Sequence, residues 1–366
     1  MKRGSRLVLA LLGAAVLTVG LAACGGSKKT SGGGAVSLRL GFVTTLQHPY
    51  GIAITQFKTA VEKASGGSIT ITPLPGASGG NDVTLLGDVS GGTVEMAAVS
   101  TAVWDSKGVN VFQPLQAPLL ITNYGFDATV LGGPIGQGML ASPAGPAKLG
   151  LVGLGLLEGG LRKPVGRAAP LKAPADFVGK KIRAPASKIM TNGLKALGAE
   201  PVSLPLGDVF TALQSGTVDG MEANYGLIVT QKFNEVAKFV TADVNLWPFP
   251  AAVVINKAQW DKLSADQQKI LQDAGAALAK EEIAGVFLNP PATATNFVKV
   301  LCDAGMTFAI AGDANRAAIA TAVKPAVDTL AADPDAGPFL KQIQDAKAAA
   351  PPPPAPPPLP TGCKKA

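Results

Sequence analysis

The sequence predicts an α/β fold with two lobes, each built on a mostly parallel sheet flanked by helices. Apolar residues alternate in some stretches, as in strands, and follow helical spacing in the stretches between them. The order strand–helix–strand–helix–strand occurs twice, over residues 37–100 and again over residues 180–224. Such units have parallel strands and right-handed crossovers. A chain of 366 residues is long enough for two lobes with cores of their own.

The first unit begins with a strand in "SLRLGFV", where Leu38, Leu40 and Phe42 point to one face. The stretch that follows has helical spacing and ends in two glycines, which are typical of the end of a helix. The remaining elements follow from the same two patterns. They are a helix over 49–67, a strand over 68–76, a helix over 81–92 and a strand over 93–100.

The second unit repeats this order, and two short motifs recur in it. "SITITPLPG" of the first unit resembles "EPVSLPLG", and "GTVEM" resembles "GTVDGM". Pro185 should stop the first strand, and Ser187 is suited to cap the next helix. The predicted elements are a strand over 180–184, a helix over 187–198, a strand over 201–207, a helix over 208–216 and a strand over 217–224.

A further apolar strand and a long helix are expected after the second unit, within residues 245–289. Ser264 and Gln267 have the spacing of a capping box at the start of this helix. About 25 residues of helix extend for about 40 Å, so we expect the helix to run along both lobes. The expected division is lobe I over 37–158 and 250–287, lobe II over 159–249 and 288–346, hinges near 157–163 and 243–250, and a proline-rich tail over 347–366.

The N-terminus has the pattern of a cleaved signal peptide over residues 1–23, with basic residues before an apolar segment. "LAAC" follows at once and resembles the lipobox of bacterial lipoproteins, which implies a lipid on Cys24 and a flexible linker over 24–36. The alternative is an ordinary signal with a chance cysteine. An exported chain with two further cysteines allows one disulfide, but the apolar residues around Cys302 favour a buried thiol.

Composition excludes some functions. The formal charge of +7 falls to about +4 without the first basic segment and contains no basic run, so nucleic acid is not an expected partner. His48 is the single histidine, and neither a nucleophile elbow nor a metal-ligand cluster is present. Glu158 and Glu222 are candidates for the two carboxylates of a glycosidase, but nothing beyond their residue type supports that function. We therefore expect a protein that is not an enzyme and needs no cofactor or metal.

Arg183 is the residue with the clearest possible role. It lies at the carboxyl end of a predicted strand, where open parallel sheets bind ligands. Its planar guanidinium matches a carboxylate with two parallel hydrogen bonds. A structural salt bridge or a solvated strand edge is the alternative, and position alone leaves both open.

Several motifs resemble those of the solute-binding proteins of TRAP transporters, of the DctP type. They include "LRLGFVTTLQHPY", "GLLEGGLRKPV", "DFVGKKIRAP" and "PVSLPLGDVFTALQSGTVDGMEAN", and the resemblance extends over about residues 37–345. It implies a fold like that of type II periplasmic binding proteins. It also implies an extracytoplasmic receptor that closes on a small organic acid and delivers it to the membrane permease subunits of a TRAP transporter. A binding lipoprotein of an ABC importer or a sensor system is the alternative, followed by a hydrolase.

The resemblance also implies the site. Arg183 would hold the ligand carboxylate and Arg162 would reinforce it, while His48 and Asn81 would approach from the first lobe. The family's ligand-touching asparagine is replaced by Ala223, with Asn224 next to it, and an aromatic position is taken by Leu206. Both changes indicate a pocket of lower polarity. Aromatic walls would come from Trp247, Tyr225 or Trp104, each of which equally suits core packing.

Overall fold

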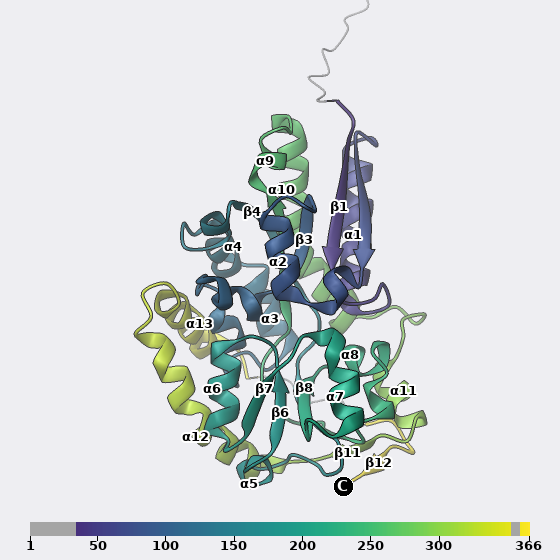
Figure 1. Ribbon diagram of the computed structural model, residues 1–366, viewed down its shortest axis with the longest axis vertical. Coiled ribbons are helices and arrows are strands. Elements are labelled where there is room, and N and C mark those ends of the chain that lie inside the picture. The colour runs from purple at the N-terminus through teal and green to yellow at the C-terminus, as the bar shows by residue number, and fades with distance from the viewer. Residues whose placement is uncertain (1–33, 353–358) are drawn as a thin grey trace, which may run out of the picture. The chain divides into compact units, whose positions relative to one another are not determined.

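Two β-sheets form the framework of the computed structural model, which describes residues 34–352 and 359–366 (Figure 1). Both sheets belong to one compact unit, Gly32–Ala366. The expected signal peptide and Cys24 lie outside the described residues, as does most of the linker.

The first sheet has the strand order β2-β1-β3-β10-β4. Strand β1 pairs in parallel with β2 and β3, whereas β10 runs antiparallel to both β3 and β4. The bounds are β1 (Val36–Phe42), β2 (Ile69–Pro75), β3 (Met96–Ser100), β4 (Leu151–Glu158) and β10 (Pro250–Asn256). The sheet thus includes a strand from the last third of the chain, which returns after five of the seven strands of the second sheet.

The second sheet has the order β12-β11-β9-β5-β8-β6-β7. Its strand β5 runs antiparallel to β8 and β9, and the other pairs are parallel. The bounds are β5 (Lys163–Gly166), β6 (Lys181–Ala184), β7 (Glu200–Ser203), β8 (Gly220–Ala223), β9 (Phe239–Thr241), β11 (Thr307–Ala309) and β12 (Lys364–Lys365). The second sheet is mostly parallel, as expected, with four of its six strand pairs parallel, whereas the first has two parallel and two antiparallel pairs. Both sheets are mixed because the strands that cross between the lobes enter each sheet in the opposite direction.

The predicted duplication is confirmed in the topology. Strands β1, β2 and β3 lie in the order β2-β1-β3, and β6, β7 and β8 lie in the equivalent order β7-β6-β8. The helices between them are α1 (Pro49–Ala64), α2 (Asp82–Ser90), α6 (Lys188–Ala196) and α7 (Val209–Ser215). Ser187 caps α6 as predicted, since its side chain accepts from the backbone N–H of Met190.

The remaining helices cover the sheets and connect them (Figure 1). They are α3 (Tyr124–Leu131), α4 (Pro134–Ala141), α5 (Pro174–Phe177), α8 (Tyr225–Thr230), α9 (Lys257–Trp260), α10 (Ala265–Glu282), α11 (Phe297–Asp303), α12 (Gly312–Ala331) and α13 (Gly337–Ala349). The predicted capping box of Ser264 and Gln267 is present at the start of α10. Helix α10 packs against β4, α1 and α3 of the first lobe, and becomes a π-helix over Ile283–Leu288 before the chain enters the second lobe.

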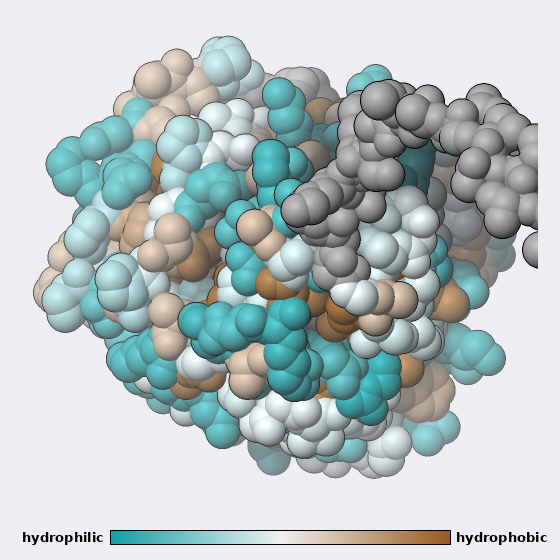
Figure 2. Space-filling model, turned by 90° about the horizontal axis from the view of Figure 1, so that it is seen from above, coloured by the Kyte–Doolittle hydropathy of each residue, from teal (hydrophilic) through white to brown (hydrophobic). Residues whose placement is uncertain are grey.

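The alternation seen in the sequence is reflected in the core of the first lobe. Leu38, Leu40 and Phe42 of β1 are buried, together with Ile54 and Phe57 of α1. Burial of each such side chain stabilises the fold by about 1.5–3 kcal/mol. Within residues 34–352 and 359–366, no helix is both long and apolar enough to cross a membrane. Figure 2 looks onto the end that carries α9 and shows hydrophilic residues over much of that face.

The chain end is attached to the second lobe by a disulfide and a short strand. Cys302 of α11 is bonded to Cys363, so the expectation of a buried free thiol is wrong. The apolar residues next to Cys302 do not report on its partner, which lies 61 positions away. Strand β12 pairs with β11 beyond this bond, so the final residues extend the sheet.

Loss of this disulfide should lower the free energy of unfolding by up to about 4 kcal/mol, because a link across 61 residues restricts the unfolded chain. Urea denaturation with and without dithiothreitol measures the effect. The Cys302→Ser/Cys363→Ser variant should have the lower midpoint and no response to the reductant. Equal midpoints for all samples would contradict a stabilising role.

Candidate ligand-binding site

A buried ion pair lies where the chain crosses between the two sheets. Arg162 follows β4 and pairs through Nε with the carboxylate of Glu222 in β8. Its Nη2 donates to the backbone oxygen of Glu222 at 2.7 Å and to Oε1 at 2.9 Å, and Trp247 Nε1 donates to Oε2 at 3.2 Å. Both charged side chains are at most 2% exposed. Burial lowers the pKa of Arg162 to about 9, so the guanidinium stays charged at neutral pH.

Arg183 lies beside this pair and has part of its guanidinium free. Nε and Nη2 donate to the backbone oxygen of Leu204 at 3.0 and 2.7 Å. Nη1 lies 3.7 Å from Glu222 Oε1, which is beyond hydrogen-bond distance. Burial lowers the pKa of Arg183 to about 10. The side chain is therefore a buried cation whose position is held by a backbone carbonyl and whose Nη1 has no hydrogen bond within the described chain.

His48 contributes a hydrogen-bond donor from the first lobe. Its Nδ1 accepts from the backbone N–H of Tyr50 at 3.1 Å and caps α1. Burial lowers the pKa of His48 to about 3, so the ring is neutral and its proton is on Nε2. Nε2 is buried and has no hydrogen-bond partner among the described residues.

Asn224 contributes a second donor from the other lobe. Its Oδ1 accepts from the backbone N–H of Leu227 at 2.7 Å and caps α8, which leaves Nδ2 buried and without a partner. The side chain of Asn224 lies close enough to His48 to raise the pKa of the ring against the effect of burial, although neither His48 Nε2 nor Asn224 Nδ2 has a partner of hydrogen-bond geometry among the described residues. Gly159 and Gly160 let the backbone of the connector lie close to these two side chains. A Cβ on Gly159 would lie 3.0 Å from His48 Cε1, and a Cβ on Gly160 would lie 3.0 Å from Asn224 Cβ.

The loop after β1 and the start of α2 contain further polar groups of the first lobe. The hydroxyls of Thr44 and Thr45 are buried without partners in the described structure. Asp82, in the first turn of α2, accepts from the backbone N–H of Ser100 at 3.0 Å. Burial raises the pKa of Asp82 to about 6, opposed by this hydrogen bond and by the charges of Arg183 and Arg162. The charges of the two arginines thus favour the ionised form of an acid of the first lobe.

Two equivalent loops of the duplicated fold meet across the site. Gly79 and Gly80, between β2 and α2, lie against Gly207, between β7 and α7. A Cβ on Gly80 would lie 2.8 Å from the backbone nitrogen of Gly207, and a Cβ on Gly207 would overlap the carbonyl oxygen of Gly79. The lobes touch backbone to backbone here, and His48, Arg162, Arg183 and Asn224 are all 3% exposed or less. The structure is therefore a closed form.

Other predicted site residues also have contacts within the fold. Asn81 caps α2, with Oδ1 accepting from the backbone N–H groups of Val83 and Thr84. Leu206 and Ala223 are buried in the apolar core. Tyr225 packs near Phe308 and has Lys163 Nζ 5.2 Å from its ring centroid.

The three candidate aromatic walls also differ in what they contact. Trp247 orients Glu222, whereas Trp104 packs on Phe112 in the first lobe. The aromatic residue next to the arginines is instead Phe249, whose ring centroid lies 4.4 Å from Arg162 Cζ. Sequence reasoning did not single out Phe249 or Asp82, whereas it did place Thr44 at the carboxyl end of a strand. Asp82 could have been found by the argument that singled out Arg183, because it opens the helix that follows the carboxyl end of a strand.

Glu158 and Glu222 are each engaged by groups of the fold. Glu222 is bound by Arg162, and Oε1 of Glu158 accepts from the backbone N–H groups of Gly160 and Phe249 at 2.6 and 2.9 Å. Glu158 belongs to a buried acidic cluster with Asp127 and Glu282. Burial raises the pKa of Glu158 to about 7, and burial together with the neighbouring acids raises those of Asp127 and Glu282 well above the ordinary range. The cluster thus holds protons at neutral pH.

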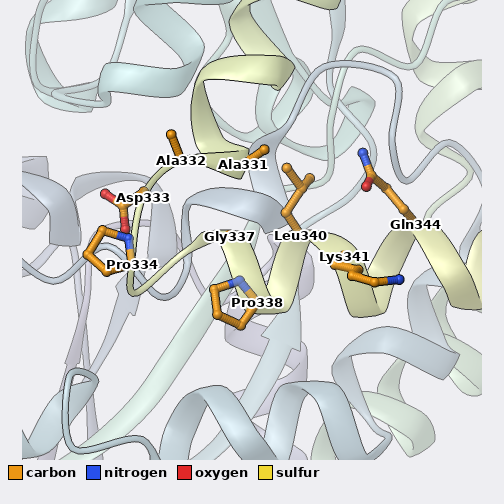
Figure 3. A pocket seen from close by; sticks show the side chains of 9 residues that line it. All are labelled: Ala331, Ala332, Asp333, Pro334, Gly337, Pro338, Leu340, Lys341 and Gln344. Carbon is orange, nitrogen blue, oxygen red and sulfur yellow. The ribbon is translucent and has the colours of Figure 1, made fainter.

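A separate surface pocket lies between α12 and α13, far along the chain from the arginines (Figure 3). Its one carboxylate, Asp333, is already engaged with Asn110 Nδ2 at 2.8 Å and with two backbone N–H groups. The described residues contain no group of three or more His, Cys, Asp or Glu side chains suited to a metal ion. The convergent polar groups of the buried site make it the stronger candidate.

Two lobes that close over buried arginines and free N–H donors define a receptor for a small anionic ligand. The chain belongs to the bacterial extracellular solute-binding protein family 7, whose DctP model matches residues 40–333. The resemblance to solute-binding proteins of TRAP transporters is thereby confirmed.

Relatives in sequence support the same assignment. The 2,3-diketo-L-gulonate-binding periplasmic protein YiaO of Escherichia coli is 32% identical over 266 residues, 71% of this chain and 78% of that protein. The C4-dicarboxylate-binding periplasmic protein DctP of Rhodobacter capsulatus is 31% identical over 284 residues, 76% and 82% of the two chains.

Solved structures show the same two-lobed fold. The sugar acid binding protein DctPAm of Advenella mimigardefordensis, in complex with galactonate, has a TM-score of 0.77 and 27% identity, covering 86% of this chain and 98% of that one. A TRAP periplasmic solute-binding protein of Shewanella oneidensis with bound succinate has a TM-score of 0.73 and 25% identity, covering 85% and 99%.

The acidic cluster predicts that stability falls as pH rises. A carboxyl whose pKa is raised in the folded state binds its proton more tightly there than in the unfolded chain. For Glu158 the resulting stabilisation is complete below about pH 4.5 and is lost as pH rises through about 7. Asp127→Asn should remove part of this dependence, and we expect it to be more stable than wild type at pH 8, on the order of 1–3 kcal/mol.

Urea denaturation at pH 5 and pH 8 checks this prediction. Asp273→Asn is the matched control, because it removes an exposed carboxylate from α10. It should follow the wild-type pH dependence. If Asp127→Asn did the same, the cluster would not be protonated in the folded state.

Proposed function

We propose that this protein captures a small organic acid between its lobes and delivers it to the permease of a TRAP transporter. The observation that carries the proposal is the convergence of two buried guanidinium groups with two unpartnered N–H donors, those of His48 and Asn224. A carboxylate accepts hydrogen bonds from such groups and offsets their burial. The ligands named for the similar proteins above are all carboxylic acids.

Each arginine has a distinct part in this proposal. Arg183 offers the free Nη1 and forms the primary contact with the ligand carboxylate. Arg162 is already paired with Glu222, so it adds positive potential and orients Glu222 beside Arg183. Closure removes water and strengthens both interactions. The connectors near 157–163 and 243–250 would be the hinges, and they are joined by backbone hydrogen bonds between Arg162 and the pair Leu246 and Trp247.

The place of action follows from the family and from the N-terminal sequence. An extracellular solute-binding protein works outside the cytoplasm, and we propose that a lipid on Cys24 attaches this one to the cell membrane. An ABC importer or a sensor system remains the rival partner, and an adjacent ATPase gene would favour it. We propose no catalytic role. A hydrolase would lose turnover on substitution of Glu222 or His48, whereas a receptor has no turnover to lose.

Arg183→Ala should weaken ligand binding about a hundredfold, because a charge-assisted hydrogen bond contributes about 1.5–3 kcal/mol. A thermal-shift screen of organic acids identifies a ligand first, since a ligand stabilises the state that it binds. Titration calorimetry then compares the two proteins. Unchanged affinity in a folded Arg183→Ala variant would contradict the assignment.

Gly207→Ala should also weaken binding, although residue 207 carries no side chain toward the ligand. The new Cβ would overlap the carbonyl oxygen of Gly79, so the closed form would be disfavoured and affinity should fall about tenfold or more. Gly87→Ala is the matched control, because a Cβ there has open space in α2. Small-angle scattering with ligand should show incomplete compaction for Gly207→Ala only. Full compaction of that variant would show that the loops do not limit closure.

A further inference from the structure

One hydrogen bond between the lobes involves none of the site residues described above. Asp105 Oδ2 of the first lobe accepts from the backbone N–H of Lys188 in the second lobe at 2.7 Å. Asp105 lies in a 3₁₀ helix, η2 (Thr101–Lys107), which follows β3 directly and packs against α2 and β10. Lys188 is the first residue of α6, between β6 and β7. The two partners therefore belong to different sheets, and neither lies in a connector between the lobes.

Asp105 satisfies a group that α6 cannot satisfy itself. The first N–H groups of a helix have no partner within the helix. Ser187, the N-cap of α6, accepts from the N–H of Met190 and leaves that of Lys188 to Asp105. Asp105 is only 4% exposed, and burial raises its pKa to about 6, opposed by the hydrogen bond from Lys188. The hydrogen bond, and not the charge, is therefore what favours this position of the side chain.

Movement of the lobes must break this bond. Asp105 and Lys188 are each fixed to the sheet of their own lobe, so rotation about the connectors near 157–163 and 243–250 changes the distance between them. A hydrogen bond weakens steeply once its two heavy atoms are more than about 3.5 Å apart. Both groups then bond to water in the open form and to each other in the closed form. Helix α6 begins shortly after Arg183, so the bond also holds the first lobe against the start of the helix that follows the ligand-binding strand.

A second contact shows how closely α6 approaches the first lobe. A Cβ on Gly193 would lie 2.8 Å from Cγ of Pro118, which belongs to the first lobe. Glycine within a helix is less favourable than alanine, and the close approach of Pro118 accounts for it at this position. The helix thus meets the first lobe at its first residue and again further along.

We propose that Asp105 is a positioning residue for ligand binding, which holds the lobes closed through the start of α6 without touching the ligand. This inference rests on the proposed function, since closure around a ligand is what gives the bond its role. The apparent affinity of a receptor depends on how readily its binding-competent form is populated. A bond that exists only in the closed form therefore raises the affinity for every ligand by the same factor.

The donor of this bond can be removed with little change to α6. Lys188→Pro takes away the backbone N–H, and proline is favoured at the first position of a helix. Ser187 before it has φ −132° and ψ 124°, the extended conformation that a residue before proline prefers. Lys188→Ala is the matched control, because it loses the same exposed side chain but keeps the N–H.

Titration calorimetry at pH 7.5 compares these proteins with galactonate, with succinate and with any other acid that the thermal-shift screen identifies. Lys188→Pro should weaken every acid that binds wild type by the same factor, about tenfold, whereas Lys188→Ala should retain the wild-type affinity. Asp105→Ala should have the same effect as Lys188→Pro, and Asp105→Asn, which keeps an oxygen for the N–H, should retain affinity. The double variant Asp105→Ala/Lys188→Pro should lose about tenfold and not a hundredfold, because both changes remove one bond.

The stability of the ligand-free protein distinguishes this role from a purely structural one. The open form lacks the bond, so urea denaturation without ligand should give Lys188→Pro no lower a midpoint than Lys188→Ala. A lower midpoint, wild-type affinity in Lys188→Pro, or effects that multiply in the double variant would overturn the inference while leaving the receptor for an organic acid intact. If no carboxylate in the screen bound to wild type, the proposed function would fail, and this inference with it.

Discussion

The buried ion pair between Arg162 and Glu222 is the interaction on which the rest of the site depends. It joins the connector that leaves the first sheet to a central strand of the second, and Trp247 of the returning connector binds the same carboxylate. Removing one partner from a buried pair destabilises a protein by about 3–5 kcal/mol, because the other charge is left uncompensated. The pair therefore fixes the crossing point of the lobes and leaves Arg183 as the cation available to a ligand.

The two lobes contribute different groups to ligand binding. The second lobe supplies the arginines and Asn224, whereas the first supplies His48. Helix caps explain how two of the donors are held: His48 and Asn224 each use one side-chain atom to cap a helix and turn the other to the site. Such anchoring limits the conformational entropy lost on binding, since the side chains are ordered before the ligand arrives. The meeting of Gly80 and Gly207 then sets how closely the lobes approach.

Much of the fold was predictable, because strands and helices leave periodic patterns and the repeated motifs indicated a duplication. The position of Arg183 at a strand end was also predictable. The sequence did not indicate the antiparallel strands, since β10 reaches the first sheet from about 150 residues further along the chain than β3. It also did not separate ligand contacts from packing residues. Trp247, Tyr225 and Asn81 have the residue types of a binding site, and only the structure shows which neighbours in space they contact.

The sequence alone determined the two β-α-β-α-β units, their helix caps and the arginine at the carboxyl end of β6, because each depends on residues close together in the chain. Only the tertiary structure decided which charges are paired. Glu222 is 60 residues from Arg162, and Cys363 is 61 residues from Cys302. Burial also decides how the site residues behave. Removal from water keeps His48 neutral, and it makes a ligand hydrogen bond favourable for each buried polar atom that has no partner.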